Sequence, residues 1–390
     1  MTDSADVVVI GGGIHGASTA FHLARRGARV TLLEAHTAAS GATGRSNGFV
    51  RMHYDLAAES ALAWQSFEYF INWAEIVGSG DCGFVETGFL RIVGPDNADS
   101  LRANVKDQLA LGIDTCIVSA AEAAEILPGL TNDDFEIAAY EPRSGYADPS
   151  GACLAFLEAA RGQGASVFQG RPASAIEVDG GRVTGVKTSG GTIATPAVVL
   201  AAGAWSKPLA ASAGVSIEVR AWHHDTSFVT RPAAVAGRLP VVIDDINVLY
   251  FRPEGEKLAL VGTEDGNRFD ELPNDDSLSD PEVVNKIVDR LPKRLPALAE
   301  GGFHSRYGGT DGMTPDQRAL LGACDVDGLI LQCGMSGTGF KTAPAIGLGI
   351  SELILDGAAH SVDISLFDAG RFAAGKPLSA DHPYGDLWRS

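Results

Sequence analysis

Three glycines near the start of the chain have the spacing of a phosphate-binding turn. Gly11, Gly13 and Gly16 follow a β-branched run, Val7–Ile10, and an apolar pattern of helical period begins directly after them. The first glycine permits a tight turn, the second leaves bare backbone for a pyrophosphate, and the third lets the helix pack closely on the strand. Because helix N-termini attract anions, this strand–turn–helix unit could bind a dinucleotide.

A carboxylate stands where such a unit needs one. Gly27 ends the helix, a second strand covers Val30–Leu33, and Glu34 follows, where it can accept the two hydroxyls of an adenosine ribose. We interpret His15 as a first-turn helix residue beside the phosphates rather than as a catalytic group. The alternative for the whole pattern is a glycine-rich turn in another kind of α/β protein, since the chain has 47 glycines.

Two further loops carry residues suited to a cofactor and its substrate. Ser40–Gly48 has small side chains and many backbone donors, and Arg51, His53 and Tyr54 follow it directly. Near the end of the chain, Gly337–Lys341 leads from a buried strand into a helix, a place that suits an anionic or carbonyl edge of a cofactor. The lysine that closes this loop would oppose the helix dipole unless an anion lies close.

The overall composition excludes several classes of partner. At 390 residues the chain exceeds what one hydrophobic core supports, so we expect two domains. The net charge of −19 argues against nucleic acid or an anionic membrane, because both would repel the protein. The longest apolar stretch, Ile193–Trp205, is too short and too interrupted by Pro196 to span a bilayer. An acidic N-terminus that enters the first strand directly predicts no secretory signal and a cytoplasmic protein.

The cysteines predict neither a disulfide framework nor a metal site. Their number is odd, they are scattered, and no two have CxxC spacing. We therefore expect no bound metal. The five positions are Cys82, Cys116, Cys153, Cys324 and Cys333.

The order of elements predicts an α/β fold of discontinuous segments. Short strands with glycine turns between 167 and 194 indicate an antiparallel meander. The apolar run Val198–Trp205 is expected to return to the parallel sheet of the first strand. The predicted division assigns 1–82, 142–214 and 308–390 to a Rossmann-like, dinucleotide-binding domain. It assigns 83–141 and 215–307 to a second, mainly antiparallel β-sheet domain that binds the substrate.

Five motifs that span nearly the whole chain occur together in one known family. They are Gly11-Gly12-Gly13-Ile14-His15-Gly16, Thr43-Gly44-Arg45 with Phe49-Val50-Arg51, Ala201-Ala202-Gly203-Ala204-Trp205, Thr314-Pro315-Asp316, and Gly337-Thr338-Gly339-Phe340-Lys341 with Pro344. Together they resemble the D-amino acid oxidase superfamily of FAD-dependent oxidoreductases, and within it the sarcosine oxidase branch of the beta-subunit type. The last motif is the most specific.

The resemblance implies that FAD binds the Rossmann-like domain and that the sheet domain holds a substrate over the flavin. Together with the motifs above, it implies cofactor contacts from Gly11, Gly13, Ile14, His15, Gly16, Glu34, Ala35, Thr43, Gly44, Arg45, Ser46, Asn47, Pro172, Ala202, Gly203, Trp205, Gly337, Thr338, Gly339, Phe340 and Lys341.

The resemblance also implies a reaction. In relatives, an arginine at the position of Arg51 and a lysine at that of Lys341 hold the substrate carboxylate, which suits a forked guanidinium and an ammonium. The expected reaction oxidises the C–N bond of an amino acid, a secondary or N-alkyl amine similar to sarcosine, by hydride transfer to flavin N5; water then hydrolyses the imine. The alternatives are a structural ion pair for Arg51 and a surface charge for Lys341. The candidates for handling the amine proton are His53, Tyr54, Glu264 and Asp311.

Two other functions stay open at this point. A 2-hydroxy acid would need the same two carboxylate-binding residues, Arg51 and Lys341, which we call the carboxylate clamp. Oxidation of a 2-hydroxy acid is therefore the alternative enzymatic function. A flavin-carrying electron-transfer subunit of a larger complex is the alternative of a different class, which leaves a partner subunit or an electron acceptor open as partner.

Departures from the family pattern bear on the cofactor. Monomeric relatives attach FAD to a cysteine about five residues before the Thr-Pro-Asp motif, whereas Tyr307–Met313 contains none. Some beta-type relatives attach a second flavin to a histidine where this chain has Asp148–Ser150. We therefore expect noncovalent FAD and no covalent FMN.

Other departures bear on oxygen and substrate. The lysine that helps monomeric relatives react with oxygen would fall near Leu258–Val261, where there is none, and Lys257 would need a shift of one or two residues. Pocket residues of relatives are replaced by Glu264 and Asp311. We therefore expect slow oxidation by oxygen, and an acidic pocket wall that favours a substrate with extra positive charge or a polar tail.

Overall fold

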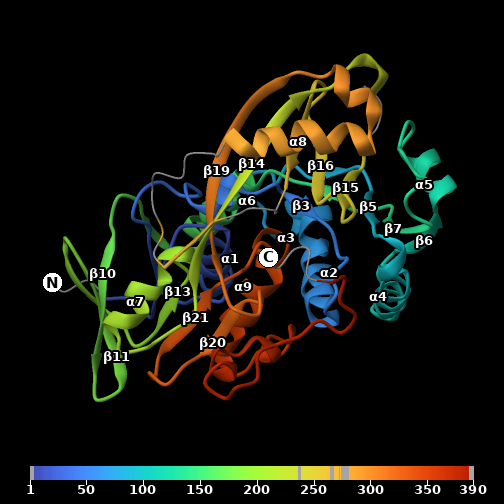
Figure 1. Ribbon diagram of the computed structural model, residues 1–390. Helices are drawn as coiled ribbons and strands as arrows, with labels where there is room; N and C mark the ends of the chain where they lie inside the picture. Colours follow the sequence, from blue (N-terminus) through green and yellow to red (C-terminus); the bar gives the residue numbers. More distant parts are fainter. Residues whose placement is uncertain (1–3, 236–238, 264–267, 272, 274–280, 386–390) are drawn as a thin grey trace.

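A six-stranded sheet joins the beginning, the middle and the end of the chain. The structure, a computed structural model, describes residues 4–235, 239–263, 268–271, 273 and 281–385 (Figure 1). The strand order is β20-β21-β13-β1-β2-β9, and all neighbours pair in parallel except β20 with β21. The strands are β1 (Val7–Ile10), β2 (Val30–Leu33), β9 (Ser166–Phe168), β13 (Val198–Leu200), β20 (Leu320–Ala323) and β21 (Leu329–Cys333). The predicted return of Val198 to the first strand is confirmed.

This sheet is covered on both faces, which explains its continuous apolar strands. Val7 and Val9 pack toward the helices, whereas Val8 and Ile10 pack toward the meander, as the alternation of strand side chains requires. The helices are α1 (Ile14–Arg25), α2 (Ala57–Ile71), α3 (Trp73–Ile76), α6 (Pro149–Gly162) and α9 (Gly339–Asp356). The other face carries the predicted antiparallel meander, β10 (Ala173–Asp179), β11 (Arg182–Thr188) and β12 (Gly191–Ala194), with α7 (Ser206–Ser212). The prediction is wrong for Val167 and Phe168, which pair in parallel with β2 as part of β9 and so extend the six-stranded sheet.

A nine-stranded, mainly antiparallel sheet forms the second half of the fold. Eight strands run in the order β18-β14-β17-β16-β15-β5-β7-β6, β19 pairs with β14, and only β5 and β15 pair in parallel. The strands are β5 (Phe89–Ile92), β6 (Cys116–Ser119), β7 (Ile137–Glu141), β14 (Arg220–Thr230), β15 (Val241–Asp244), β16 (Leu249–Glu254), β17 (Leu258–Gly262), β18 (Arg268–Asp270) and β19 (Phe303–Met313). Figure 1 shows α8 (Pro281–Arg294) across this sheet, and α4 (Ala98–Ala110) and α5 (Ala120–Ile126) at its end.

The connection between the two halves is made by short strands and by two long ones. β3 (Phe49–Val50), β8 (Gly145–Tyr146) and β4 (Val85–Glu86) form a three-stranded sheet. β14 and β19 pair from residue 220 with 313 to residue 229 with 303. The predicted division between 307 and 308 therefore falls inside β19, because this strand continues unbroken toward the first half.

Candidate active site

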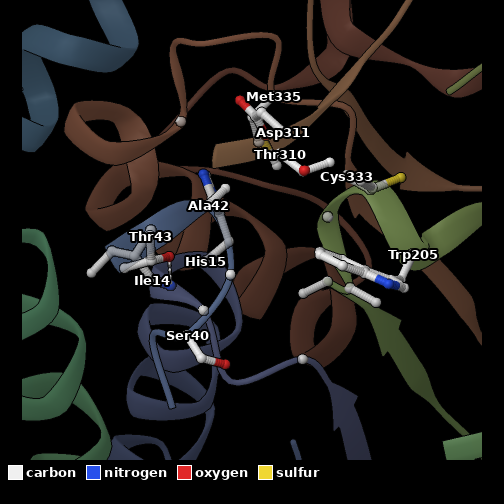
Figure 2. A pocket seen from close by; sticks show the side chains of 18 of the residues that line it. Ile14, His15, Ser40, Ala42, Thr43, Trp205, Thr310, Asp311, Cys333 and Met335 are labelled. Carbon is white, nitrogen blue, oxygen red and sulfur yellow. Dashed lines mark hydrogen bonds between the residues drawn. The ribbon is translucent and has the colours of Figure 1, made fainter. Parts of the chain in front are cut away.

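A large cavity lies at the carboxyl ends of the parallel strands, where open α/β sheets bind their ligands. Its volume is about 550 Å³. It is lined by the residues that end or follow the four central strands, including Gly11, Glu34, Ala201 and Cys333. Figure 2 shows it from close by, with Ile14, His15, Ala42 and Thr43 on one side and Trp205 and Cys333 on the other.

Two of the motif glycines are required by close backbone contacts. Gly11 has φ +114°, and a Cβ there would lie 2.3 Å from the carbonyl oxygen of Ala201. A Cβ at Gly16 would lie 2.0 Å from the carbonyl oxygen of Gly11, so the first turn of α1 packs directly on the turn that precedes it. At Gly13 the nearest atom to a Cβ would be Thr43 Oγ1, at 3.1 Å, and this residue lines the cavity.

Glu34 is bound by backbone donors on both carboxylate oxygens. Gly12 N donates to Oε2 at 2.7 Å and His36 N donates to Oε1 at 2.8 Å. These bonds fix the side chain at the cavity wall. Because a carboxylate offers about four lone-pair positions, Glu34 keeps acceptor capacity for the ribose hydroxyls proposed from the sequence.

Most of the expected cofactor contacts come together in this one cavity. Gly16 and Gly44 do not line it, since each makes close backbone contacts, and Arg45 instead donates to the carbonyl of Gly308 at 3.1 Å. Thr338 and Lys341 line a second cavity. The expected residues that line the large cavity are Gly11, Gly13, Ile14, His15, Glu34, Ala35, Thr43, Ser46, Asn47, Pro172, Ala202, Gly203, Trp205, Gly337, Gly339 and Phe340.

The polar atoms of the large cavity suit a phosphate-bearing cofactor. The N-termini of α1 and α9 both lie at it, and neither N-cap residue, Gly13 or Thr338, caps its helix with a side chain. Both ring nitrogens of His15 are buried without a hydrogen-bond partner among the described residues. Burial lowers the pKa of His15 to about 4, so this ring is neutral at physiological pH. A ligand with acceptor and donor groups would satisfy these atoms.

The geometry around Gly309 bears on whether a cysteine at this position could be attached covalently to FAD. This residue lies five positions before Thr314, and a Cβ at Gly309 would meet Arg45 Cβ at 2.8 Å and His224 Nε2 at 3.0 Å. A cysteine side chain therefore has no room there. Cys333 lines the cavity, but burial raises the pKa of its thiol to about 12, which keeps it protonated and weakly nucleophilic.

A smaller cavity of about 150 Å³ adjoins the large one. Asn47, Trp222, Tyr250 and Gly337 line both, so the two spaces share a wall. Four cationic side chains line the smaller cavity: Arg51, Arg91, Arg318 and Lys341. Arg91 pairs with Asp245 at 2.9 Å, and Arg318 pairs with Asp55 and Glu59 at 2.8 and 2.6 Å.

The two predicted carboxylate-binding residues meet in this smaller cavity. The guanidinium of Arg51 lies 4.3 Å from the ring centroid of Tyr54, and Nζ of Lys341 lies 5.6 Å from the same centroid. Arg51 makes no ion pair with a described residue, and its Nε has no hydrogen-bond partner among them. Lys341 is only 4% exposed, which excludes a surface charge. The structure thus disfavours both alternative readings of these residues.

His53 and Tyr54 line the smaller cavity as neutral groups. Burial, together with the charges of Arg91 and Arg51, holds the pKa of His53 well below its ordinary value. Burial raises the pKa of Tyr54. Neither side chain is charged at physiological pH, and Nε2 of His53 lies 2.6 Å from the hydroxyl of Tyr384.

Asp311, one of the two residues of the expected acidic pocket wall, lies at the large cavity, and its part in substrate choice stays a prediction. Its carboxylate accepts from Gly312 N at 2.7 Å and from Gly337 N at 2.9 Å. Asp311 therefore holds the Gly337–Lys341 loop in place. Glu264, the other residue of that prediction, lies outside the described residues.

Lys257 does not occupy a position from which it could replace the lysine that helps monomeric relatives react with oxygen. It lies in the exposed turn between β16 and β17. Of the described lysines, only Lys341 lines either cavity.

Several lining residues were not found from the sequence. Trp222 and His224 are two apart on β14 and so share one face of that strand. The aromatic and histidine cluster at 222–224 is the signal that could have identified them. Arg91, Arg318 and Tyr384 carry no local motif. They enter the smaller cavity from β5, from the residues before β20 and from the end of the chain.

The comparisons with known proteins agree with this geometry. A family model described as FAD dependent oxidoreductase matches residues 6–353. The chain belongs to this family. FAD is therefore its cofactor, and the resemblance inferred from the motifs is confirmed.

Individual relatives cover nearly all of the chain. Human mitochondrial sarcosine dehydrogenase is 30% identical over 98% of this chain but over only 43% of its own length. Sarcosine oxidase subunit beta from an Arthrobacter species is 26% identical, over 95% of this chain and 92% of that protein. The crystal structure of L-proline dehydrogenase from P. horikoshii matches with a TM-score of 0.89 and 28% identity, over 97% of this chain and 100% of that one. The predicted fold class is confirmed.

The described residues form neither a membrane-spanning helix nor a cluster of metal ligands. None of the described helices has the length and apolar character needed to cross a membrane. Within the same residues, no group of three or more histidine, cysteine, aspartate or glutamate side chains could hold a metal ion.

Proposed function

We propose that this protein is an FAD-dependent oxidoreductase for a small secondary or N-alkyl amino acid, whose C–N bond it oxidises to an imine that water hydrolyses. The observation that carries this proposal is the pairing of Arg51 and Lys341 in a cavity of about 150 Å³ that adjoins the cofactor cavity. A carboxylate between these two cations would satisfy the buried Nε of Arg51 and leave the amine end of a small substrate near the shared wall.

The residues of the smaller cavity bind and orient the substrate. FAD, bound in the large cavity by the residues named above, supplies the hydride acceptor. Arg51 and Lys341 fix the carboxylate, and Trp222 and Tyr250 limit the space at the shared wall. Because the cavity is cationic, it disfavours a bound ammonium and so holds the substrate amine neutral, with its nitrogen lone pair available. His53, being neutral and paired with Tyr384, keeps the wall uncharged.

The cofactor is proposed to bind without a covalent bond. The space at Gly309 and the protonated thiol of Cys333 support this. We further propose an acceptor other than oxygen, since Lys257 lies in an exposed turn. The names of two relatives, sarcosine dehydrogenase and L-proline dehydrogenase, agree with such an acceptor.

A substrate panel tests the proposal. The purified holoenzyme is mixed without oxygen with sarcosine, proline, glycine, lactate and the methyl esters of the amino acids, and flavin absorbance is followed. We expect sarcosine or proline to bleach the flavin and the esters to fail. Bleaching by lactate alone would support the 2-hydroxy acid alternative. No bleaching by any of them, with turnover restored only by another subunit, would support a subunit of a larger complex, which the name of the Arthrobacter relative allows.

A further inference from the structure

The described end of the chain returns to the smaller cavity. After α9, residues 378–385 run past the start of α2 and along α4, drawn in red in Figure 1. A series of hydrogen bonds, one between two backbone groups and four between a side chain and the backbone, holds this segment. They are Leu378 N to Asp316 Oδ2 (2.9 Å), Asp381 N to Asp55 O (2.8 Å), Ala57 N to Asp381 Oδ2 (2.9 Å), Asn104 Nδ2 to His382 O (2.8 Å) and Asn97 Nδ2 to Tyr384 O (3.1 Å).

Tyr384 is the residue of this segment that reaches the cavity. It is 4% exposed and lines the cavity together with Gly385. Its ring stacks on the imidazole of His53, with centroids 5.8 Å apart, and the guanidinium of Arg91 lies 4.8 Å from its centroid. Arg91 is itself fixed by Asp245. The tyrosine ring is therefore held between a neutral imidazole and a neutralised guanidinium.

The hydroxyl of Tyr384 is hydrogen-bonded to His53. Its oxygen lies 2.6 Å from Nε2 of the imidazole. Nδ1 of His53 has no hydrogen-bond partner among the described residues, and Gln108 Nε2 donates instead to the carbonyl of Tyr54 at 3.2 Å. The bond to Tyr384 is therefore the hydrogen bond that fixes the imidazole ring. Because burial raises the pKa of Tyr384, its phenol stays protonated and takes part in this bond as a neutral group.

The same histidine fixes the carboxylate-binding arginine. Nη1 of Arg51 donates to the carbonyl oxygen of His53, which bends the side chain back so that its guanidinium lies over Tyr54 and 5.5 Å from the ring centroid of Phe89. A shift of residue 53 would move this carbonyl and release the guanidinium. A chain of contacts thus runs from segment 378–385 to the proposed carboxylate site.

We propose that Tyr384 is a positioning residue for substrate binding, through which the C-terminal segment 378–385 holds His53 and so aims Arg51 into the cavity. This inference rests on the proposed function, because it assumes that Arg51 binds the carboxylate of the substrate. Tyr384 and Gly385 of this segment also line one side of the cavity, so the position of the segment affects the space available to substrate.

The test compares Tyr384→Phe and Tyr384→Ala with wild type as holoenzymes of equal FAD content. Acetate is titrated into each oxidised protein while flavin absorbance reports its Kd, and kcat, KM and Tm are measured. Loss of one hydrogen bond in Tyr384→Phe should raise the acetate Kd and the KM about three- to tenfold, with a small change in Tm. Tyr384→Ala should raise both by about tenfold or more, since the stacked ring is lost as well.

Tyr69→Phe is the matched control. Its hydroxyl also faces a histidine nitrogen, His22 Nε2 at 3.4 Å, but neither residue lines the cofactor cavity or the smaller cavity. This variant should keep the wild-type Kd and KM. If both Tyr384 variants lower Tm but bind acetate as tightly as wild type, Tyr384 is merely structural and the inference is wrong.

The clamp variants separate this inference from the proposed function. If Arg51→Ala weakens acetate binding and the Tyr384 variants do not, only the positioning role fails. If Arg51→Ala and Lys341→Met both bind acetate as wild type does, the carboxylate is held elsewhere, and the proposed function fails with it.

Discussion

Arg51 and Lys341, which lie far apart in the sequence, place their charges over the ring of one residue, Tyr54. The two distances to the ring centroid are 4.3 and 5.6 Å. Two cations beside one aromatic ring repel each other, and a carboxylate between them would lower the electrostatic free energy of both. This arrangement favours an anionic ligand at that position, and the first prediction follows from it.

Arg51→Ala should raise KM strongly, and kcat should fall as well if the substrate loses its orientation. A charge-assisted contact contributes about 1.5–3 kcal/mol, so a loss of about ten- to a hundredfold in kcat/KM is expected. Lys341→Met should act similarly. Because both residues bind the same group, the double variant should lose less than the two single losses combined. Steady-state kinetics with an amino acid and its methyl ester measures the effect. Variants that still prefer the acid as strongly as wild type would contradict the clamp.

FAD should leave the protein on acid or heat precipitation. The space that a tethering cysteine would need at Gly309 is taken by Arg45 and His224, and the thiol of Cys333 stays protonated. The measurement is the flavin absorbance of the supernatant after precipitation, compared with that of the holoenzyme. Flavin retained in the washed pellet would show a covalent bond.

Substitutions at two of the motif glycines should have different effects. Gly13→Val should abolish FAD binding while the protein still folds, since the nearest described atom to a Cβ there is the Thr43 hydroxyl and the residue faces the cavity. Gly16→Ala should destabilise the fold itself, because its Cβ would lie 2.0 Å from the carbonyl of Gly11.

Gly162→Ala is the control for both glycine variants, as nothing lies within 4 Å of a Cβ there. Bound flavin per chain and Tm distinguish the outcomes. A Gly13→Val variant that purifies with full FAD would place the pyrophosphate elsewhere.

Oxygen should reoxidise the reduced enzyme slowly compared with a dye or a quinone. No described lysine other than Lys341 lines either cavity, and Lys341 is proposed to bind substrate. Stopped-flow reoxidation of substrate-reduced enzyme by air-saturated buffer and by a quinone gives the two rates. Rapid peroxide formation at air saturation would overturn this expectation.

Stability should fall as the pH drops below about 6.5, the ordinary pKa of histidine. His22 is buried, and burial lowers its pKa to about 3. A depressed pKa means that the unfolded chain binds this proton first, so the stabilisation present above about pH 6.5 is lost progressively toward pH 3. The slope for one such group is about 1.4 kcal/mol per pH unit.

His22→Gln should reduce this slope, because it removes one group that titrates only in the unfolded state. The measurement is Tm of wild type and variant at about pH 7, 6 and 5. Equal Tm losses in both proteins would show that His22 contributes nothing to the acid sensitivity.

The sequence by itself determined the cofactor-binding unit, because its physical requirements are local. A β-branched strand, a turn that only glycine permits and a helix start must follow one another in the chain, so Gly11, Gly13 and Gly16 can be recognised without their neighbours in space. The meander and the return of β13 were also predictable. Both the alternation of apolar and polar residues in a half-buried strand and the unbroken apolar run of a fully buried strand can be recognised within a short stretch of sequence.

Only the tertiary structure decided what surrounds the substrate. The sequence indicates no partner for Asp311, whereas in the structure its carboxylate accepts hydrogen bonds from two backbone N–H groups. Arg91 and Tyr384 have no motif, and they reach the cavity because β5 and segment 378–385 pack against the loop that follows β3. Such contacts join residues that are distant in the sequence. Their partners and their desolvation, which set charge and orientation, exist only once the chain has folded.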